Sequence, residues 1–219
     1  PRYPASWSPD AESSAAALAK GWEFTPRDAD ALARWMRAQV HAGAAGSVCV
    51  ILHGVAPDTV FDDDPSPQCL ARRYLDAGGR LVWAGDVPFF YRGRADGAKD
   101  YRNDAGTHEA VLDIPLRWDW EMPGASGLTD AGRAFGLRTS DEALRCADAS
   151  CVTTVLAGAG AFASSWLKTY AKDAPGSGFL RFRGGGFRPE LVPELAAAAL
   201  HALPPRPVLG AAELPQAEG

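Results

Sequence analysis

The clearest pattern of apolar positions lies in the second quarter of the chain. Residues 47–52 (SVCVIL) form a short apolar run with β-branched members, which predicts a strand buried on both faces. Residues 67–77 repeat their apolar positions at helical spacing after a Ser-Pro start, and Gly78-Gly79 ends that helix. A second apolar run follows at residues 80–84 (RLVWA). A strand, a helix and a strand within this length predict a right-handed parallel crossover.

Strand and helix patterns alternate over most of the remaining chain. Further helices are predicted at residues 10–20, 26–40, 129–135, 162–170 and 189–203. Further strands are predicted at residues 22–25, 109–114, 151–157 and 178–182, and a long polar loop at residues 91–108. This succession predicts an α/β fold: a three-layer α/β/α sandwich with a mainly parallel, doubly wound (flavodoxin-like) sheet. We expect a single domain over residues 1–203, followed by a Pro/Ala-rich tail or linker at residues 204–219.

Charge and composition exclude several classes of protein. The 219 residues are 47% apolar, as in an ordinary globular domain, and the net charge of −5 provides no general attraction for nucleic acid or anionic lipid. No run approaches the roughly 18 apolar residues that span a bilayer, and the first residues lack the pattern of a secretory signal. Four cysteines are too few for a disulfide scaffold. We therefore expect a cytoplasmic protein without nucleic-acid or membrane partners. The sequence leaves open whether it forms a homo-oligomer.

Tyr74 to Asp86 (YLDAGGRLVWAGD) combine a Y-x-x-x-G-G signature on a helix with a strand that ends in a turn. This arrangement resembles class I glutamine-amidotransferase-like domains, and among them the ThuA-like branch. The resemblance places the turn where true amidotransferases carry their nucleophilic cysteine. Here the turn is Gly85-Asp86-Val87, and no His-x-Glu pair stands near the C-terminus, where His201 is followed by Ala202. Because glutaminase chemistry needs a thiolate beside an imidazole, the resemblance implies an amidotransferase-like module without that activity.

The same resemblance predicts a first strand that precedes Pro1 or is compressed into Arg2-Tyr3. The chain is then expected to be part of a larger bacterial protein.

Ligands of open parallel sheets bind beyond the carboxyl ends of the strands, so the loops after Leu52 and Ala84 are the predicted site. These loops and the N-terminal loop offer an imidazole, carboxylates, guanidinium groups and aromatic surfaces: His53, Gly54, Asp58, Asp86, Tyr91, Arg92 and Arg94, with Trp7 and Ser8. The leading hypothesis is a regulatory module that binds a small polar ligand or a partner domain here. The alternative is a hydrolase in which Asp86 acts with His53 or a bound water.

A third hypothesis rests on residues 158–163 (GAGAFA), which fit G-x-G-x-x-A between a predicted strand and a predicted helix. That context is the one required by the dinucleotide fingerprint. Arg181 and Arg183 follow in the next predicted strand, where arginines suit the 2′-phosphate of NADP. Gly158, Gly160 and Ala163 would then bind NADP or another nucleotide.

No metal site is expected. Asp62, Asp63 and Asp64 are consecutive, so that their side chains point apart and into solvent. Cys146 and Cys151 form a C-x4-C spacing without a second pair or a nearby histidine. Beyond the NADP alternative, the sequence names no cofactor.

Overall fold

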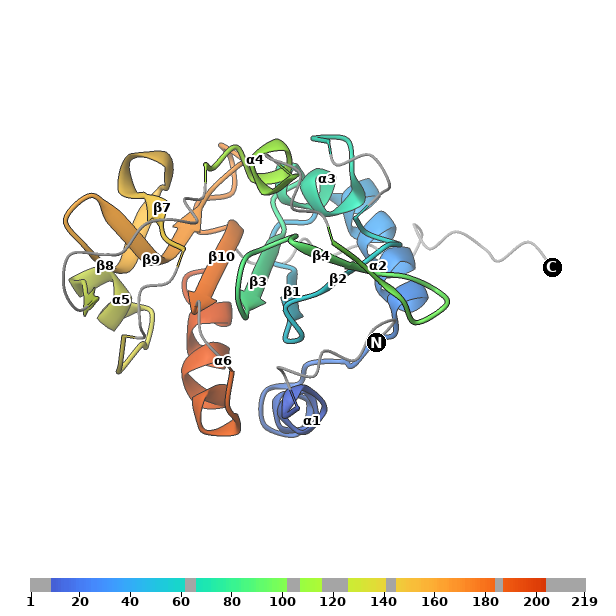
Figure 1. Cartoon of the computed structure of the whole chain (residues 1–219), viewed down its shortest axis with the longest axis horizontal. Helices are drawn as coiled ribbons and strands as arrows, with labels where there is room; N and C mark the ends of the chain where they lie inside the picture. Colours follow the sequence, from blue (N-terminus) through green and yellow to red (C-terminus); the bar gives the residue numbers. More distant parts are fainter. Residues whose placement is uncertain are drawn as a thin grey trace.

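The computed structural model describes residues 9–61, 66–101, 107–115, 126–140, 145–183 and 187–203. Over these residues the chain forms a mixed α/β fold with a seven-stranded sheet, a smaller three-stranded sheet, and helices on both faces of the larger sheet (Figure 1). None of the helices in this part of the chain is both long and apolar enough to cross a bilayer. The α/β class predicted from the sequence is confirmed.

The larger sheet has the strand order β1-β3-β10-β9-β8-β6, and β7 pairs with β9 off this path. Its strands are β1 (Val48–Ile51), β3 (Arg80–Ala84), β6 (Gly127–Leu128), β7 (Ala147–Asp148), β8 (Thr154–Ala159), β9 (Phe162–Lys168) and β10 (Gly178–Arg183). β1, β3 and β10 are parallel, whereas β9, β8 and β6 each run antiparallel to their neighbours. The prediction of a mainly parallel sheet is therefore wrong for the half formed by β6 to β9.

The difference comes from residues 162–170, which were expected to be helical and instead contain β9. β8 and β9 are joined by the two residues Gly160-Ala161, and Gly160 has a φ of 57°. A two-residue turn with glycine first is the ordinary connection of a tight hairpin. The hairpin returns the chain beside β8, and β9 then pairs with β8 on one edge and β10 on the other.

Two further strand predictions are wrong. Residues 109–114 fall largely in a helix, α4 (Thr107–Leu112). Residues 22–25 form no strand, because α1 (Ala11–Trp22) extends to Trp22 and ends at Glu23, whose φ is 60°. The short apolar segments at both places were compatible with either type of element, and packing decided between them.

The predicted loop at residues 91–108 contains two short strands, β4 (Tyr91–Gly93) and β5 (Lys99–Tyr101). They pair antiparallel with each other, and β4 pairs parallel with β2 (Ala56–Pro57) to complete the smaller sheet. The chain after β1 and the chain after β3 therefore meet again in a second, small sheet.

Helices cover the two faces of the larger sheet. On the face that carries Val82 and Ala84 lie α1 and α6 (Val192–Leu200), the latter preceded by a 3-10 turn (Pro189–Leu191). On the face that carries Leu81 and Trp83 lie α2 (Ala29–Ala42), α3 (Leu70–Asp76) and α4. Alternate residues of β3 thus enter opposite cores, as a strand buried on both faces requires. A short helix, α5 (Asp130–Ala134), lies beside β8, and a 3-10 turn (Ala149–Cys151) follows β7.

The strand–helix–strand unit predicted at residues 47–84 is confirmed, and β1 and β3 are parallel. The Tyr74 hydroxyl lies 2.9 Å from the Ser47 hydroxyl, so the end of α3 is tied to the start of β1. The Tyr74 ring lies over Gly79, because a Cβ built on Gly79 would be only 2.3 Å from Cζ of Tyr74. The Y-x-x-x-G-G signature therefore has a structural cause: the second glycine leaves room for the tyrosine ring.

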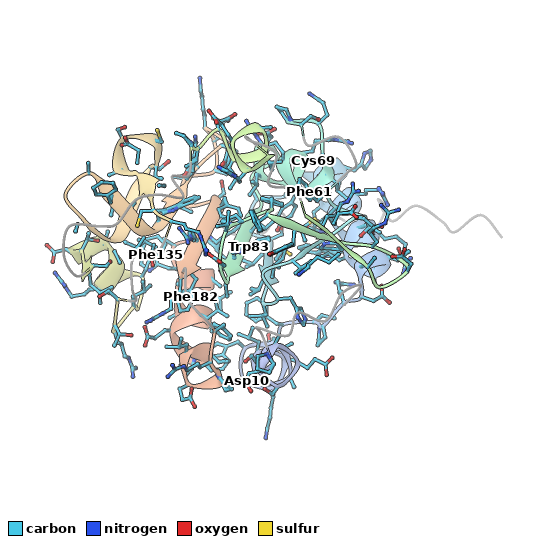
Figure 2. The ribbon with its side chains drawn as sticks, in the orientation of Figure 1. Asp10, Phe61, Cys69, Trp83, Phe135 and Phe182 are labelled. Carbon is cyan, nitrogen blue, oxygen red and sulfur yellow. The ribbon has the colours of Figure 1, made fainter. Side chains whose placement is uncertain are left out.

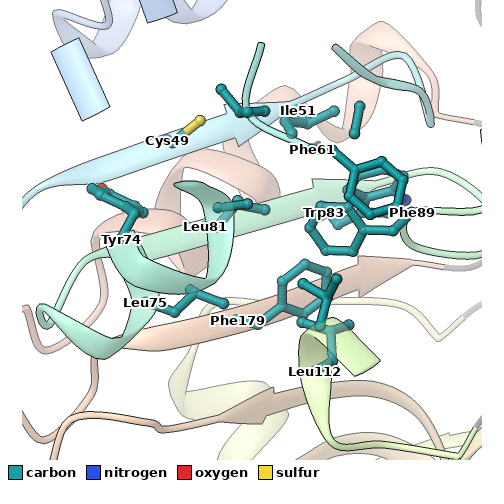
Figure 3. Close-up of a cluster of buried hydrophobic side chains, with 14 of the residues drawn as sticks. Cys49, Ile51, Phe61, Tyr74, Leu75, Leu81, Trp83, Phe89, Leu112 and Phe179 are labelled. Atoms are coloured by element: carbon teal, nitrogen blue, oxygen red, sulfur yellow. The ribbon is translucent and has the colours of Figure 1, made fainter. Parts of the chain in front are cut away.

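An aromatic cluster anchors the loop after β3 (Figure 3), and Figure 2 labels two of its members, Phe61 and Trp83, within the whole chain. The Trp83 and Phe89 rings have centroids 5.2 Å apart, and Phe61 lies 5.1 Å from Phe89. Phe179 of β10 completes the cluster at 5.9 Å from Phe89. Since Phe89 is fully buried, the intervening residues 85–88 are held close to the end of β3.

Candidate functional site

The loops after β1 and β3 begin at the same edge of the sheet. Ile51 pairs with Trp83 at the end of the parallel ladder. Beyond it the two loops touch: a Cβ built on Gly85 would lie 3.0 Å from Cα of Gly54, and Gly85 has a φ of 143°. The expected juxtaposition of these loops is confirmed. We call residues 53–54 and 85–86, together with Arg145, the β1–β3 rim.

Asp86 is a partly exposed carboxylate of the rim that two hydrogen bonds hold in place. Its carboxylate accepts a charged hydrogen bond from Nη1 of Arg145, and 46% of its side chain is exposed. Its main-chain oxygen accepts a hydrogen bond of 3.1 Å from Nε1 of Trp83. Asp86 is thus held through its main chain by Trp83 and through one carboxylate oxygen by the Arg145 guanidinium.

Arg145 was not anticipated from the sequence. It lies 59 positions from Asp86 in a polar stretch without a motif. Its main-chain oxygen accepts a hydrogen bond of 2.6 Å from Nη1 of Arg181, which is buried in β10. Arg145 also has a left-handed backbone, with a φ of 53°. β7, which lies just after Arg145 in the chain, pairs with β9 of the β8–β9 hairpin, and this pairing brings Arg145 to the rim.

His53 supplies the imidazole of the rim. Burial lowers the pKa of its imidazole below the ordinary value, and Glu12 at the start of α1 acts in the opposite direction. The ring is therefore neutral at physiological pH, when it can both donate and accept a hydrogen bond.

The remaining predicted ligand-binding residues build the smaller sheet. Nη2 of Arg92 lies 2.5 Å from Oδ2 of Asp100, and Nη1 of Arg94 lies 3.1 Å from the same oxygen. The hydrogen bond from Arg92 lowers the pKa of Asp100. Tyr91 stacks with the Lys99 ammonium at 4.2 Å from its ring centroid. These side chains have structural interactions across the β4–β5 hairpin.

Asp58 contributes to the same small sheet, because its main-chain N–H donates to the Gly93 carbonyl at 2.9 Å. Trp7 and Ser8 lie outside the described residues, as do Asp62, Asp63 and Asp64.

The glycines of the proposed nucleotide motif have structural causes in the β8–β9 hairpin. A Cβ on Gly158 would be 2.1 Å from the Phe162 carbonyl oxygen, so the strands approach too closely for a side chain. Gly160 provides the positive φ of the turn, and Ala163 pairs with Gly158 across the ladder. The helix expected after this motif is absent, and with it the helix N-terminus that would bind a phosphate.

The two arginines that follow, Arg181 and Arg183 in β10, also form hydrogen bonds within the protein. Arg181 donates to the Arg145 carbonyl, as described above. Nη2 of Arg183 donates to the Thr139 carbonyl at 2.8 Å and lies 3.4 Å from Oε2 of Glu194. Both side chains are buried, so the prediction of a 2′-phosphate site at this strand has no support in the geometry.

A cleft of about 850 Å³ runs along the outer side of β1 and reaches His53. Residues 23–28 also line it, and α1 and α2 supply apolar side chains from the two sheet faces, among them Leu18, Trp22, Leu32 and Trp35. Asp86 is not part of this lining. The cleft and the rim therefore share the His53 end of β1 and are otherwise distinct.

A protein-family model described as the MJECL34 family matches residues 1–195. The chain belongs to the MJECL34 family. It is similar to the protein MJECL34 of Methanocaldococcus jannaschii, with 39% identity over 99 residues that cover 43% of this chain and 33% of that relative. The aligned part thus spans about a third of the relative's length. No solved structure matches the chain.

The family match includes every rim residue, from His53 to Arg145, and both walls of the cleft at β1 and α1. The rim and the cleft are therefore features of the part of the chain that defines its family membership.

Proposed function

We propose that this chain is an amidotransferase-like binding module without glutaminase activity, which takes a small polar ligand or a partner domain at the β1–β3 rim. The parallel half of the sheet, with helices on both faces, supports a flavodoxin-like arrangement around this rim. All four cysteines are free, which supports a cytoplasmic setting.

The observation that carries the proposal is the ion pair of Asp86 with Arg145 at the position where an amidotransferase would present a nucleophile. The pair offers both a donor and an acceptor to a ligand. The left-handed backbone of Arg145 adds support, since such positions cluster at functional sites.

An NMR screen with small carboxylate, amide and phosphate fragments tests the proposal. Fragments that bind should shift the amide signals of Gly54 and Gly85, and Asp86→Asn should weaken binding by about tenfold, the loss of one charged hydrogen bond. Asp130→Asn is the matched control, because it breaks an exposed ion pair with Arg133 on α5. Hits that map away from the rim, or that bind Asp86→Asn unchanged, would contradict the proposal.

A hydrolase remains the second candidate, because the contact of Gly54 with Gly85 brings the His53 and Asp86 loops to one edge. In that case His53 would act as general base and Asp86 as its partner or as the nucleophile. The test is turnover of p-nitrophenyl acetate and p-nitrophenyl phosphate. A hydrolase requires activity that is lost in both His53→Ala and Asp86→Asn and kept in Asp130→Asn.

A further inference from the structure

β1 forms an open edge of the larger sheet, because within the described residues it pairs with β3 alone. The main-chain N–H of Arg80 donates to the Ser47 carbonyl at 3.0 Å, which sets the phase of the parallel ladder. Alternate residues of such a ladder direct both main-chain groups to the same side. Cys49 therefore directs its groups to β3, whereas Val48 and Val50 direct theirs away from it. The Val48 carbonyl and the Val50 N–H are the acceptor and the donor at the centre of this edge.

The cleft along β1 places this edge between two apolar walls. Val48 and Val50 line the cleft. Leu18 of α1 lines it from one face of the sheet, and Leu32 and Trp35 of α2 line it from the other. The space between the walls therefore continues the plane of the sheet. A flat molecule placed there would have apolar side chains on both faces and main-chain groups along one edge.

The edge requires hydrogen bonds from whatever enters the cleft. A main-chain N–H or C=O that loses its water without gaining another partner costs free energy. A purely aliphatic occupant, such as an acyl chain, would impose this cost at both Val48 and Val50. An aromatic heterocycle with a donor and an acceptor side by side can instead bond to the Val48 carbonyl and the Val50 N–H together. Adenine has this arrangement, because its amino group lies beside ring nitrogens that accept.

The charges of the cleft lining distinguish a neutral ligand from a phosphorylated one. Glu12, Glu23 and Asp28 contribute carboxylates to the lining, and Arg27 contributes a guanidinium. The Arg27 guanidinium also lies 5.7 Å from the ring centroid of Trp35. Among the described lining residues, three carboxylates against one guanidinium make the cleft negative, so a phosphate is repelled. The hydroxyl groups of a sugar, by contrast, can donate hydrogen bonds to carboxylates.

We propose that the cleft binds a neutral aminopurine nucleoside of the adenosine type, with its base in the plane of the sheet. The amino group donates to the Val48 carbonyl, and the neighbouring ring nitrogen accepts from the Val50 N–H. The side chains of α1 and α2 cover the two faces of the base, and Trp35 adds an aromatic contact. The volume of about 850 Å³ lies within the range of small-molecule sites. This inference concerns the cleft and does not depend on the ligand proposed for the rim.

An NMR titration of residues 1–219 with adenosine tests the proposal. Binding should shift the amide signal of Val50 more than that of Cys49, whose N–H points to β3. Purine riboside, which lacks the amino group, should bind about tenfold more weakly because one hydrogen bond is lost at the edge. Adenosine monophosphate should also bind more weakly than adenosine, because its phosphate enters a negative cleft. The proposal is overturned if adenosine produces no saturable shift of Val50, or if either analogue binds as tightly as adenosine.

A bulky side chain on α1 provides an independent test. Ala16 is exposed and lines the cleft, so Ala16→Trp should preserve the fold and fill space that the base needs. Lys20→Trp is the matched control, because Lys20 is an exposed residue of the same helix outside the lining. With circular dichroism confirming both folds, adenosine affinity should fall at least about tenfold in Ala16→Trp and stay unchanged in Lys20→Trp.

Unchanged adenosine binding by folded Ala16→Trp would contradict the placement of the ligand in the cleft. Asp86→Asn alters the rim and not the cleft lining, so it should leave adenosine binding unchanged. Failure of the rim proposal is therefore separable from failure of this one.

Discussion

Arg80 should be among the side chains on which folding most depends. It is fully buried in β3, and its Nη1 donates to three carbonyls at the end of α6: Ala198 at 3.2 Å, Ala199 at 3.0 Å and His201 at 2.7 Å. Its Nη2 donates to the Gly176 carbonyl. The last carbonyls of a helix have no partners within that helix, and a cation there also compensates the helix dipole. Arg80 thus connects the sheet, α6 and the turn before β10.

The expected cost follows from two opposing effects. Hydrogen bonds to a charged group contribute about 1.5–3 kcal/mol each, and buried carbonyls left without donors cost about 1–3 kcal/mol each. Burial of the guanidinium opposes folding and lowers the pKa of Arg80 to about 10. The net loss for Arg80→Met should be about 3–4 kcal/mol, a large part of the roughly 5–15 kcal/mol that stabilises a typical domain. Arg80→Lys keeps the charge but not the fork of donors, and should lose about half as much.

Urea-induced unfolding, monitored by tryptophan fluorescence, measures these differences as shifts of the midpoint at unchanged slope. Arg133→Met is the matched control, because Arg133 forms an exposed ion pair with Asp130 on α5 and should cost less than about 1 kcal/mol. If Arg80→Met lost less than about 1 kcal/mol, the helix-end carbonyls would not depend on this side chain and the reasoning would be refuted.

Two further changes test the core. Burial, and to a lesser extent the charge of Arg181, lowers the pKa of His108 to about 4. The contribution of His108 to stability is therefore complete above pH 6.5 and is lost as the pH falls toward 4, by at most about 3 kcal/mol. His108→Phe should flatten the plot of urea midpoint against pH over this range, and an unchanged profile would assign the pH dependence to other groups. Gly79→Ala should displace the Tyr74 ring and lower the free energy of unfolding by about 2–3 kcal/mol. A Cβ on Gly21 of α1 meets nothing within 4 Å, so Gly21→Ala should raise that free energy by about 0.5–1 kcal/mol. Thermal melts of both variants measure these changes, and equal effects would refute the steric explanation.

The central crossover could be predicted from local sequence because each element carries its own signal. The apolar run at residues 80–84 matches β3 residue for residue, and the two glycines after α3 end that helix where expected. β10 and α5 also lie where their apolar patterns and capping residues place them. In each case the residues that specify the element are neighbours in the chain, so no distant contact was needed to recognise it.

The antiparallel half of the sheet and the composition of the site were decided by tertiary contacts. Residues 162–168 are compatible with a helix until a two-residue turn places them between β8 and β10. Asp86 was recognisable as a rim residue from its place after β3, but its partner Arg145 was not, because that ion pair joins segments 59 residues apart. The sequence by itself determined the parallel β1–β3 unit and which loops reach the carboxyl ends of its strands. Which groups meet there, and what lies beside the edge of β1, depended on how the later hairpin and the first helix pack, since long-range pairing leaves no periodic trace in the chain.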